Sequence, residues 1–428
     1  MKIARTITTV AAGTSLVISM AGTALAGGVS SDDLLMSLKK LVEQQQERLD
    51  NQASEIAQLK EQLAAVTKTA DSKVDREEFE KIGVDKVVSS SNKSVNVSLY
   101  GHVNRAVLWA DNGDSSKTYF VDNMNSSTRM GLKARAQATE DLSIGGLIEY
   151  QLVSNASTDV NQHEQDTTAK LDLRWADVDF KSNKFGTLYI GHGSTASDGT
   201  AEVDLSGTSV IAYSPVEYAA GGQFWYDSSS NMLTSLKVKD AFNNMDGLSR
   251  RDRIRYDSPS FAGLTVADSA IEEGSFDAAL KYSRKFDAVT VAGALSWASP
   301  RDIIPGVDKQ YAGSLSMLLN NGFNLTFASG LREMLDDGRD DAGYWYTKLG
   351  YKASLFSPGT TAFSLDYGQS NDLAANDDEG KSFGAAFVQN IEDWGTEIYL
   401  TYRLYQLDRD HYDFDNVNAV MTGARIKF

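Results

Sequence analysis

The sequence predicts an all-β transmembrane barrel of about sixteen antiparallel strands, preceded by an N-terminal α-helical coiled coil. Three observations lead to this prediction. From Val95 onward, apolar and polar residues alternate with the period of two that a half-buried strand requires. Tight turns alternate with longer polar connections between these runs. Upstream of Val95, the apolar spacing changes to that of a heptad repeat.

Residues 1–26 have the anatomy of a secretory signal peptide. Lys2 and Arg5 provide a basic start, an apolar stretch follows, and "ALA" at 24–26 forms a small-residue cleavage motif. A transmembrane anchor is the alternative, but the apolar run is short and "SSDD" follows it closely. We therefore expect a Sec-type signal peptide that is removed on export.

The chain that remains after cleavage is acidic and contains no cysteine. Without Lys2 and Arg5, 39 of the 41 basic residues remain against 58 acidic ones, so the net charge is near −19. This charge argues against nucleic acid as a partner. The lack of cysteine excludes disulfides and thiolate-bound metals. No later segment has the roughly 20 consecutive apolar residues that a membrane helix needs.

Residues 31–67 are predicted to form a periplasmic coiled coil, and the polar stretch 68–94 is predicted to be a linker. The heptad repeat runs without a slip, and Glu55 and Lys60 are placed to pair between helices. A single amphipathic helix on a core is the alternative, but sustained spacing of 3.5 residues is typical of coiled coils. The seam implies self-association without choosing between dimer and trimer. Its residues are Leu35, Leu38, Val42, Gln45, Leu49, Gln52, Ile56, Leu59, Leu63 and Val66.

The barrel domain is expected over residues 95–428. In its first run, Leu99 and Val103 share an apolar face, whereas Tyr100 and His102 share the polar face. The later runs alternate in the same way. The expected strands lie near 95–109, 128–138, 142–154, 168–180, 186–192, 249–258, 261–270, 275–284, 288–298, 309–319, 322–332, 342–354, 359–370, 380–390, 394–407 and 416–428.

The connections favour a membrane barrel over a soluble sandwich or propeller. Short turns such as "NNG" and "FSPG" alternate with longer polar connections, of which 193–248 is the longest. Tight periplasmic turns and long external loops are typical of outer-membrane barrels. A soluble fold would need an apolar core, yet one strand face carries Arg251, Arg253 and Arg255. These charges suit a polar, water-filled lumen.

Arg105 interrupts the apolar face of the first strand. Facing lipid at the bilayer midplane, an arginine would cost roughly 2–4 kcal/mol. A bulge could turn the side chain inward, or the strand could contact a neighbouring subunit. The second alternative is favoured because the coiled coil would hold the first strands of several subunits near one axis. We therefore expect Arg105 in an oligomer interface, with an acidic or carbonyl partner that the sequence does not identify.

Several segments together resemble the Gram-negative porin family, and especially its alphaproteobacterial-type members. They are "LYGHVNRAVLW" (99–109), "FGTLYIGHGSTASDGT" (185–200), "RIRYDSPSFAGLTV" (253–266) and the terminal "ARIKF". The resemblance covers roughly residues 95 to 428. It implies a trimeric sixteen-stranded barrel with one pore per subunit, whose third external loop folds inward. It also implies that Phe428 belongs to the signal read by the barrel-assembly machinery.

The resemblance further implies a pore constriction in which acidic and basic side chains face each other. The connection 193–248 matches the inward loop by position and length, so Asp198, Glu202 and Asp204 are expected on the acidic side. Such an arrangement sets up a transverse field that orients dipolar solutes. Solvated loop or lumen positions are the alternative for each single charge. The expected basic wall consists of Arg129, Lys133, Arg135, Arg174, Arg251, Arg253 and Arg255.

The predicted function is that of an outer-membrane porin, a channel for passive diffusion of small hydrophilic solutes and ions. A substrate-selective channel and a barrel-anchored periplasmic tether are the alternatives. The four histidines lack the spacing of metal or nucleophile sites, so we expect no enzyme, cofactor or metal. The expected partners are two further copies in a homotrimer, outer-membrane lipid and lipopolysaccharide, and the barrel-assembly machinery. Peptidoglycan is an open candidate for the coiled coil.

Overall fold

The computed structural model describes residues 94–428 together with Met36, 39–40 and Val87–Val88. The predicted signal peptide 1–26 and every seam residue of the predicted coiled coil lie outside the described residues. Within the described part of the chain, no helix has the length and apolar character needed to span a membrane.

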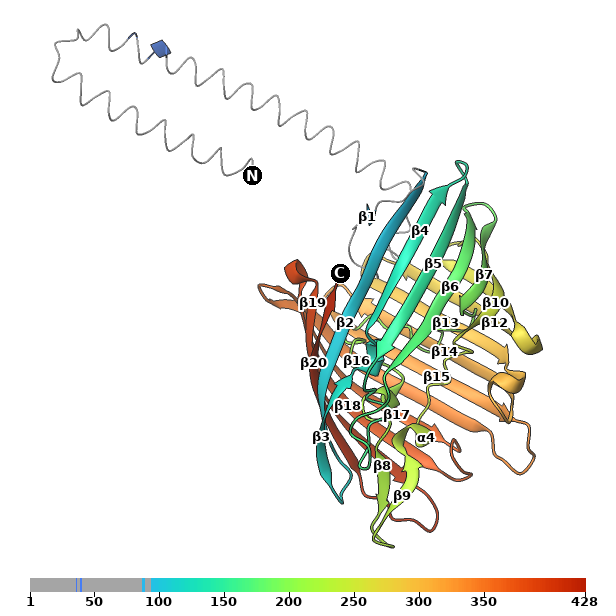
Figure 1. Cartoon of the computed structure of the whole chain (residues 1–428), viewed down its shortest axis with the longest axis vertical. Coiled ribbons are helices and arrows are strands. Elements are labelled where there is room, and N and C mark those ends of the chain that lie inside the picture. The colour runs from blue at the N-terminus through green and yellow to red at the C-terminus, as the bar shows by residue number, and fades with distance from the viewer. Residues whose placement is uncertain (1–35, 37–38, 41–86, 89–93) are drawn as a thin grey trace, which may run out of the picture. The chain divides into compact units, whose positions relative to one another are not determined.

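Within residues 94–428, sixteen strand positions form a closed antiparallel barrel (Figure 1), because β20 pairs with β2. Each consecutive pair of strands is antiparallel, as the alternating turns and loops predict. The barrel strands are β2 (Val95–Asp111), β3 (Ser116–Asp122), β4 (Arg129–Gln137), β5 (Leu142–Val153), β6 (Lys170–Ser182), β7 (Gly186–Ser194), β10 (Arg250–Asp257), β11 (Leu264–Ile271), β12 (Phe276–Lys285), β13 (Val289–Ser299), β14 (Val307–Leu319), β15 (Phe323–Met334), β16 (Ala342–Phe356), β17 (Gly359–Asn371), β18 (Glu379–Ile391), β19 (Thr396–Asp408) and β20 (Val417–Lys427).

One strand position is divided between β3 and β4. Both pair with β2, β3 along its second half and β4 along its first half. The 3-10 helix η1 (Met124–Ser126) separates them. No strand was expected between residues 109 and 128, so β3 is a correction to the sequence prediction. The strand is short and is followed at once by "NMNSS", whose asparagines and serines favour turns. In the predicted linker, β1 (Val87–Val88) also pairs with β2.

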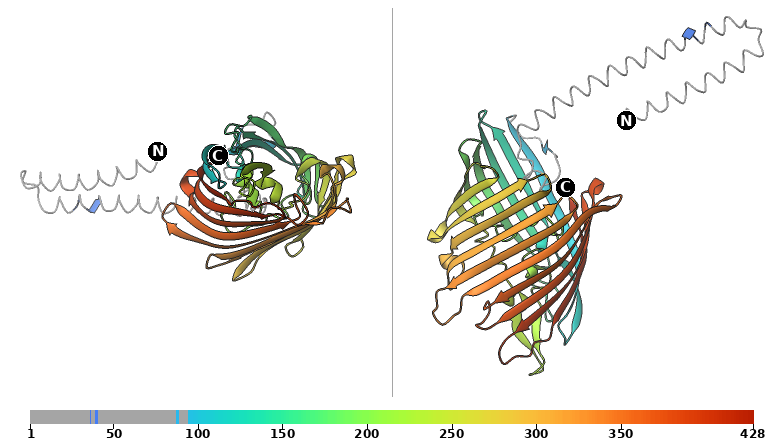
Figure 2. Two further views of the ribbon diagram at one scale, coloured as in Figure 1. Left: turned by 90° about the horizontal axis from the view of Figure 1, so that it is seen from below. Right: turned by 180° about the vertical axis from the view of Figure 1, so that it is seen from behind.

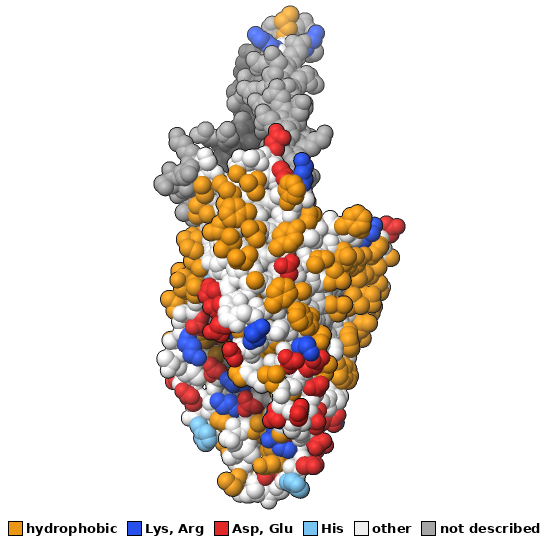
Figure 3. All heavy atoms as spheres, turned by 90° about the vertical axis from the view of Figure 1, so that its right-hand side faces the viewer, with side chains coloured by type: hydrophobic (Ala, Val, Ile, Leu, Met, Phe, Trp, Pro, Cys, Tyr) orange, Lys and Arg blue, Asp and Glu red, His pale blue; other side chains and the backbone are white. Residues whose placement is uncertain are grey.

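The outer face of the barrel is apolar, as the alternation predicts. Leu99 is 40% exposed and Val103 48%, whereas Asn104 and Leu108 on the opposite face are fully buried. Figure 3 shows hydrophobic side chains spread over a broad area of one side of the wall. Three further 3-10 helices interrupt the connections, and they are η3 (Glu272–Gly274), η4 (Arg301–Ile303) and η5 (Glu392–Trp394).

The connection between β7 and β10, residues 195–249, is called the inward connection below, because most of it folds into the barrel (left view of Figure 2). Only the tip of its hairpin extends past the end of the barrel (Figure 1). It contains η2 (Val216–Tyr218), the hairpin β8 (Phe224–Asp227) and β9 (Met232–Lys237), and the short helix α4 (Val238–Ala241). Backbone groups along this connection form hydrogen bonds with side chains of the inner wall. The amide of Val203 donates to Ser314 Oγ (2.9 Å), and the hydroxyl of Tyr405 donates to the carbonyl of Val216 (2.7 Å).

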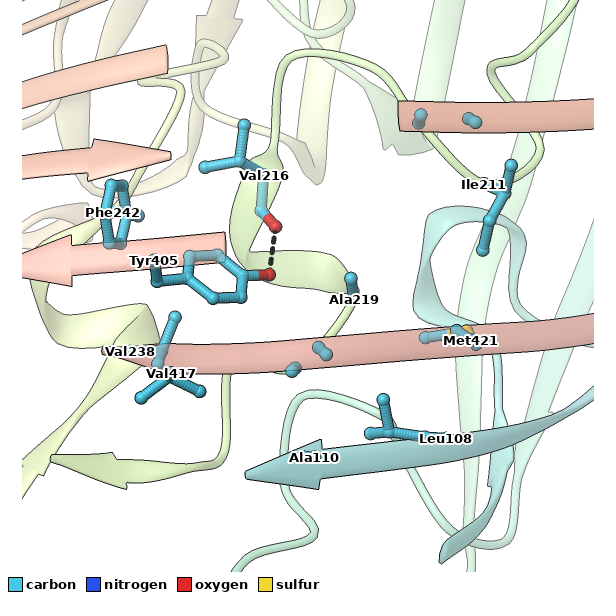
Figure 4. Packing of buried hydrophobic residues seen from close by; sticks show 14 of the residues in the cluster. Leu108, Ala110, Ile211, Val216, Ala219, Val238, Phe242, Tyr405, Val417 and Met421 are labelled. Atoms are coloured by element: carbon cyan, nitrogen blue, oxygen red, sulfur yellow. Dashed lines mark hydrogen bonds between the residues drawn. The ribbon is translucent and has the colours of Figure 1, made fainter. Parts of the chain in front are cut away.

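A hydrophobic core fills part of the barrel interior. Side chains of the inward connection, including the fully buried Trp225 and Phe242, pack against β2, β3 and β16–β20. Figure 4 shows this packing around Tyr405. Met421 of β20 is fully buried in it. The sequence predicted a polar lumen throughout. That prediction holds only for part of the wall, because the inward connection covers the rest.

Candidate channel constriction

Three arginines of the wall opposite the hydrophobic core form a group that we call the arginine cluster: Arg129 of β4, Arg174 of β6 and Arg250 of β10. The three guanidinium groups interact electrostatically with one another. Arg174 donates to Glu149 (2.6 Å) and Gln151 (3.0 Å), and Arg129 donates to the carbonyl of Ser127 (3.0 Å). Among the described residues, Arg250 Nε has no hydrogen-bond partner.

A bulge in β6 explains why Arg174 points into the lumen. Glu149 of β5 pairs with Trp175, and the next residue of β5 pairs with Leu173, so Arg174 is the extra residue. An extra residue puts two consecutive side chains on one face of the sheet. Leu173 is 40% exposed on the outer face, and the guanidinium of Arg250 lies 6.0 Å from the ring centroid of Trp175.

Asp198, Glu202 and Asp246 of the inward connection form the carboxylate cluster, which faces the arginines. Asp198 Oδ2 lies 3.8 Å from Arg250 Nη2, and Glu202 also interacts electrostatically with Arg250. Asp246 accepts hydrogen bonds from the amides of Gly199 and Ala201, both at 2.7 Å. These two bonds clamp the segment that carries Asp198 and Glu202.

Burial and mutual repulsion change the acidity of this cluster. Burial, together with the charges of Asp246 and Asp198, raises the pKa of Glu202 well above its usual range. Burial and the charge of Asp198 raise the pKa of Asp246 to about 7. Both side chains therefore carry protons more readily than an exposed carboxylate. The acidic side of the constriction changes its charge around neutral pH.

The structure places Asp204 away from the carboxylate cluster. Its side chain is 3% exposed and forms an ion pair with Lys348 of β16, which also donates to the carbonyl of Ala212 (2.8 Å). A carboxylate so buried cannot line open water. Asp204 instead anchors the inward connection to the wall, which corrects its expected position at the constriction.

The remaining residues of the expected basic wall make local contacts along β4 and β10. Arg253 is 4% exposed and pairs with Asp177 (2.7 Å), so it lies within the packed wall. The others are more accessible. Arg135 pairs with Asp179 (2.7 Å), Arg255 with Asp257 (2.7 Å), Arg251 donates to the carbonyl of Leu248 (3.3 Å), and the ammonium of Lys133 lies 5.3 Å from the ring centroid of Tyr100.

Sequence reasoning missed Arg250, Asp246 and two tyrosines at the constriction. Arg250 directly precedes Arg251, the first of the alternating arginines of β10. In a regular strand, neighbouring residues point to opposite faces, so the pattern predicts that Arg250 points out of the barrel. Asp246 lies 44 residues after Glu202, in the return limb of the connection. Tyr213 and Tyr218 lie with ring centroids 6.2 Å apart and interact electrostatically with Glu202. Only the folded connection brings them together.

Arg105 points outward, and its partner belongs to the same chain. Its guanidinium lies 2.7 Å from Asp122 Oδ2 and donates to Ser154 Oγ (2.5 Å). Its side chain is 45% exposed, whereas that of Asp122 is 2% exposed. The inward alternative is thereby wrong. The pair lies where η1 interrupts the wall, so Arg105 and Asp122 bridge the break between β3 and β4.

Phe428 closes the barrel next to Gly101. The backbone amide and carbonyl of Phe428 bond to those of Gly101 at 3.0 and 2.9 Å. A Cβ atom on residue 101 would lie 2.9 Å from the Phe428 ring, so glycine leaves room for the ring over β2. Among the described residues, no group of three or more histidine, aspartate or glutamate side chains could hold a metal ion.

Known structures share this fold at low sequence identity. An anion-selective porin from Comamonas acidovorans has a TM-score of 0.53 at 16% identity, covering 78% of this chain and 100% of its own. A loop L8 deletion mutant of OmpT, an outer membrane protein of Vibrio cholerae, has a TM-score of 0.53 at 13% identity, with the same coverage. The outer membrane channel DcaP of Acinetobacter baumannii has a TM-score of 0.51 at 12% identity, covering 80% and 100%.

No curated protein matches the sequence. The family model described as Gram-negative porin matches residues 63–410, which is most of the chain. The match and the shared barrel favour a diffusion channel over a substrate-selective channel, a tether or an enzyme. The chain therefore belongs to the Gram-negative porin family and forms an outer-membrane channel for passive diffusion of small hydrophilic solutes and ions.

Proposed function

We propose that solutes cross the barrel between the arginine cluster and the carboxylate cluster. The observation that carries this proposal is their opposition, with Arg250 of the wall near Asp198 and Glu202 of the inward connection. The hydrophobic core occupies the other side of the lumen. Water and ions favour the charged side, because apolar packing excludes them.

The opposed charges would select solutes by their dipole as well as by size. Fixed cations on β4, β6 and β10 and carboxylates on the inward connection create a field across the path. A solute with separated charges gains energy by aligning with this field, and an apolar solute gains nothing. The preferred solutes are therefore small, hydrophilic and polar or charged.

Reversal potentials across planar bilayers test this path. Arg129→Gln and Arg250→Gln should each shift the permeability ratio of KCl severalfold toward cations, because each removes a fixed positive charge from the constriction. Arg301→Gln, in η4 at an external turn, is the matched control and should leave the ratio unchanged. An unchanged ratio in both constriction variants would place the ion path elsewhere.

We also propose a homotrimer whose contacts include the first strand near Arg105. Porins of this family are generally trimeric in the outer membrane. The exposed Arg105 side chain and the predicted coiled coil upstream of the same strand support this assembly. We further propose that the terminal strand with Phe428 is read by the barrel-assembly machinery. The coiled coil would extend into the periplasm, where peptidoglycan is a candidate partner.

A further inference from the structure

Glu217 is an acidic residue buried in the hydrophobic core, whereas a carboxylate of a porin lumen is expected to face water. It belongs to η2 and is 5% exposed. Among the described residues, its Oε2 atom has no hydrogen-bond partner. With this oxygen left without a hydrogen bond, an ionised carboxylate in such a site is very costly. The geometry therefore favours the uncharged acid while the core is packed.

The cations near Glu217 already have partners of their own. Arg403 of β19 donates to both carboxylate oxygens of Asp366 on β17 (2.8 and 3.1 Å). Arg332 of β15 donates to Gln310 (2.7 Å) and Asn243 (3.0 Å). Lys239 of α4, which packs on η2, pairs with Asp159 (2.9 Å). None of these three forms an ion pair with Glu217 among the described residues.

The tyrosines around Glu217 fasten the adjoining backbone. Tyr344 of β16 donates to the carbonyl of Ser214 (2.8 Å), and Tyr405 of β19 donates to that of Val216 (2.7 Å). Tyr218 of η2 is the other titratable neighbour. Tyr344 and Tyr405 hold this part of the inward connection against β16 and β19. Opening of these contacts would let water reach the Glu217 carboxylate.

We infer that Glu217 is a pH-sensitive fastening point of the inward connection. Its uncharged form keeps η2 packed against β16 and β19, and its ionisation favours release of this segment into water. Loosening the segment changes the width and the fluctuations of the channel, because the same connection carries the carboxylate cluster. The inference depends on the inward position of the connection and not on the ion selectivity proposed above.

The direction of the pH effect follows from the acidity of Glu217. Burial raises its pKa from 4.5 to about 8 in the packed state. A released, hydrated segment would have the ordinary value. The packed state is therefore favoured most below pH 4.5, loses favour as the pH rises to about 8, and changes little beyond that. The packed-to-released ratio would fall by up to about 10³-fold over this window.

Amide hydrogen exchange of the full chain in detergent tests the inference. After correction for intrinsic exchange rates, protection of residues 210–220 should fall by up to a few hundredfold between pH 5 and pH 8. In Glu217→Gln this fall should disappear, because the isosteric amide does not titrate. Glu217→Leu, a second neutral variant, should also lack this fall in protection. Either variant is therefore sufficient for the test if it folds.

Two control variants separate this effect from other titrations. Glu164→Gln changes an exposed acid of the β5–β6 connection, and Glu202→Gln changes the constriction itself. Both should keep the pH-dependent loss of protection. The inference is overturned if Glu217→Gln loses protection as the unaltered protein does, if the unaltered protein shows no pH dependence, or if Glu202→Gln abolishes it.

Discussion

At the residue scale, the pair of Arg105 and Asp122 shows how a charge on the outer wall is tolerated. Asp122 Oδ2 accepts bonds from Arg105 and from the amides of Ser154 and Asn155 (2.7 and 2.8 Å). These bonds compensate the removal of Asp122 from water. Nothing in the sequence pairs Arg105 with Asp122, because the partner becomes available only where η1 breaks the strand.

Arg105→Glu should weaken the subunit contacts, because it places a carboxylate next to the buried Asp122. Removing one partner of a buried ion pair costs about 3–5 kcal/mol of stability. Because Arg105 is partly exposed, we expect the loss here to be near or below the lower of these values. We expect a lower dissociation temperature of the oligomer in detergent without loss of the folded barrel. Deleting residues 34–66 should lower it further. Light scattering measures both effects, and a monomer in the unaltered protein would refute the proposed interface.

The carboxylate cluster should make ion selectivity depend on pH. The pKa of Asp246 is raised to about 7, so this group is uncharged at acidic pH and becomes negative as the pH rises through neutrality. The pKa of Glu202 is raised as well. Guanidinium groups stay charged throughout. From the sequence, the negative net charge and acidic loops, opposed by the basic wall, predict only a weak cation preference. The constriction instead predicts anion preference at pH 5 that moves toward cations by pH 9.

Asp246→Asn should reduce this movement of the reversal potential, whereas Asp302→Asn in η4 should not. The first removes a titrating group of the constriction, and the second changes only an external turn. A reversal potential that stays constant from pH 5 to pH 9 would show that neither Glu202 nor Asp246 faces the ion path.

At the element scale, the inward connection is a packed structure with its own hairpin and helix. Trp225 of β8 is fully buried in the hydrophobic core. Trp225→Ala should therefore destabilise the protein by about 3–5 kcal/mol, through lost burial and the cavity it leaves. Phe185→Ala, at a turn where the ring is 75% exposed, is the matched control and should change stability little. Heat-induced unfolding in detergent compares them, and equal midpoints would contradict the packing.

Apart from β3, the barrel strands were predictable from the sequence, and the interior of the inward connection was not. Period-two alternation places strands because one face meets lipid and the other does not. Within 195–249 the chain meets no lipid, so its side chains have no lipid-facing side that could impose a regular alternation. Asp198 and Glu202 were therefore predicted by position along the connection, while Asp204, two residues further, turns to Lys348 instead.

At the scale of the whole molecule, contacts between the first and last strands close the barrel, and the inward connection divides its lumen. Closure depends on the pairing of β2 with β20 and on the Phe428 ring over Gly101. Division of the lumen leaves a hydrophobic side along β16–β20 and a charged side along β4–β10. Closure could be predicted from the terminal alternation. The division could not, because it depends on contacts between residues more than a hundred positions apart.

The most direct test of this division uses the absence of native cysteine. Gln151→Cys lies beside Arg174 on the charged side, and Met421→Cys lies in the hydrophobic core. A water-soluble, positively charged thiol reagent added during single-channel recording should lower the current through the Gln151→Cys channel. It should leave the Met421→Cys channel unmodified. Rapid modification of Met421→Cys with Gln151→Cys unaffected would contradict the account.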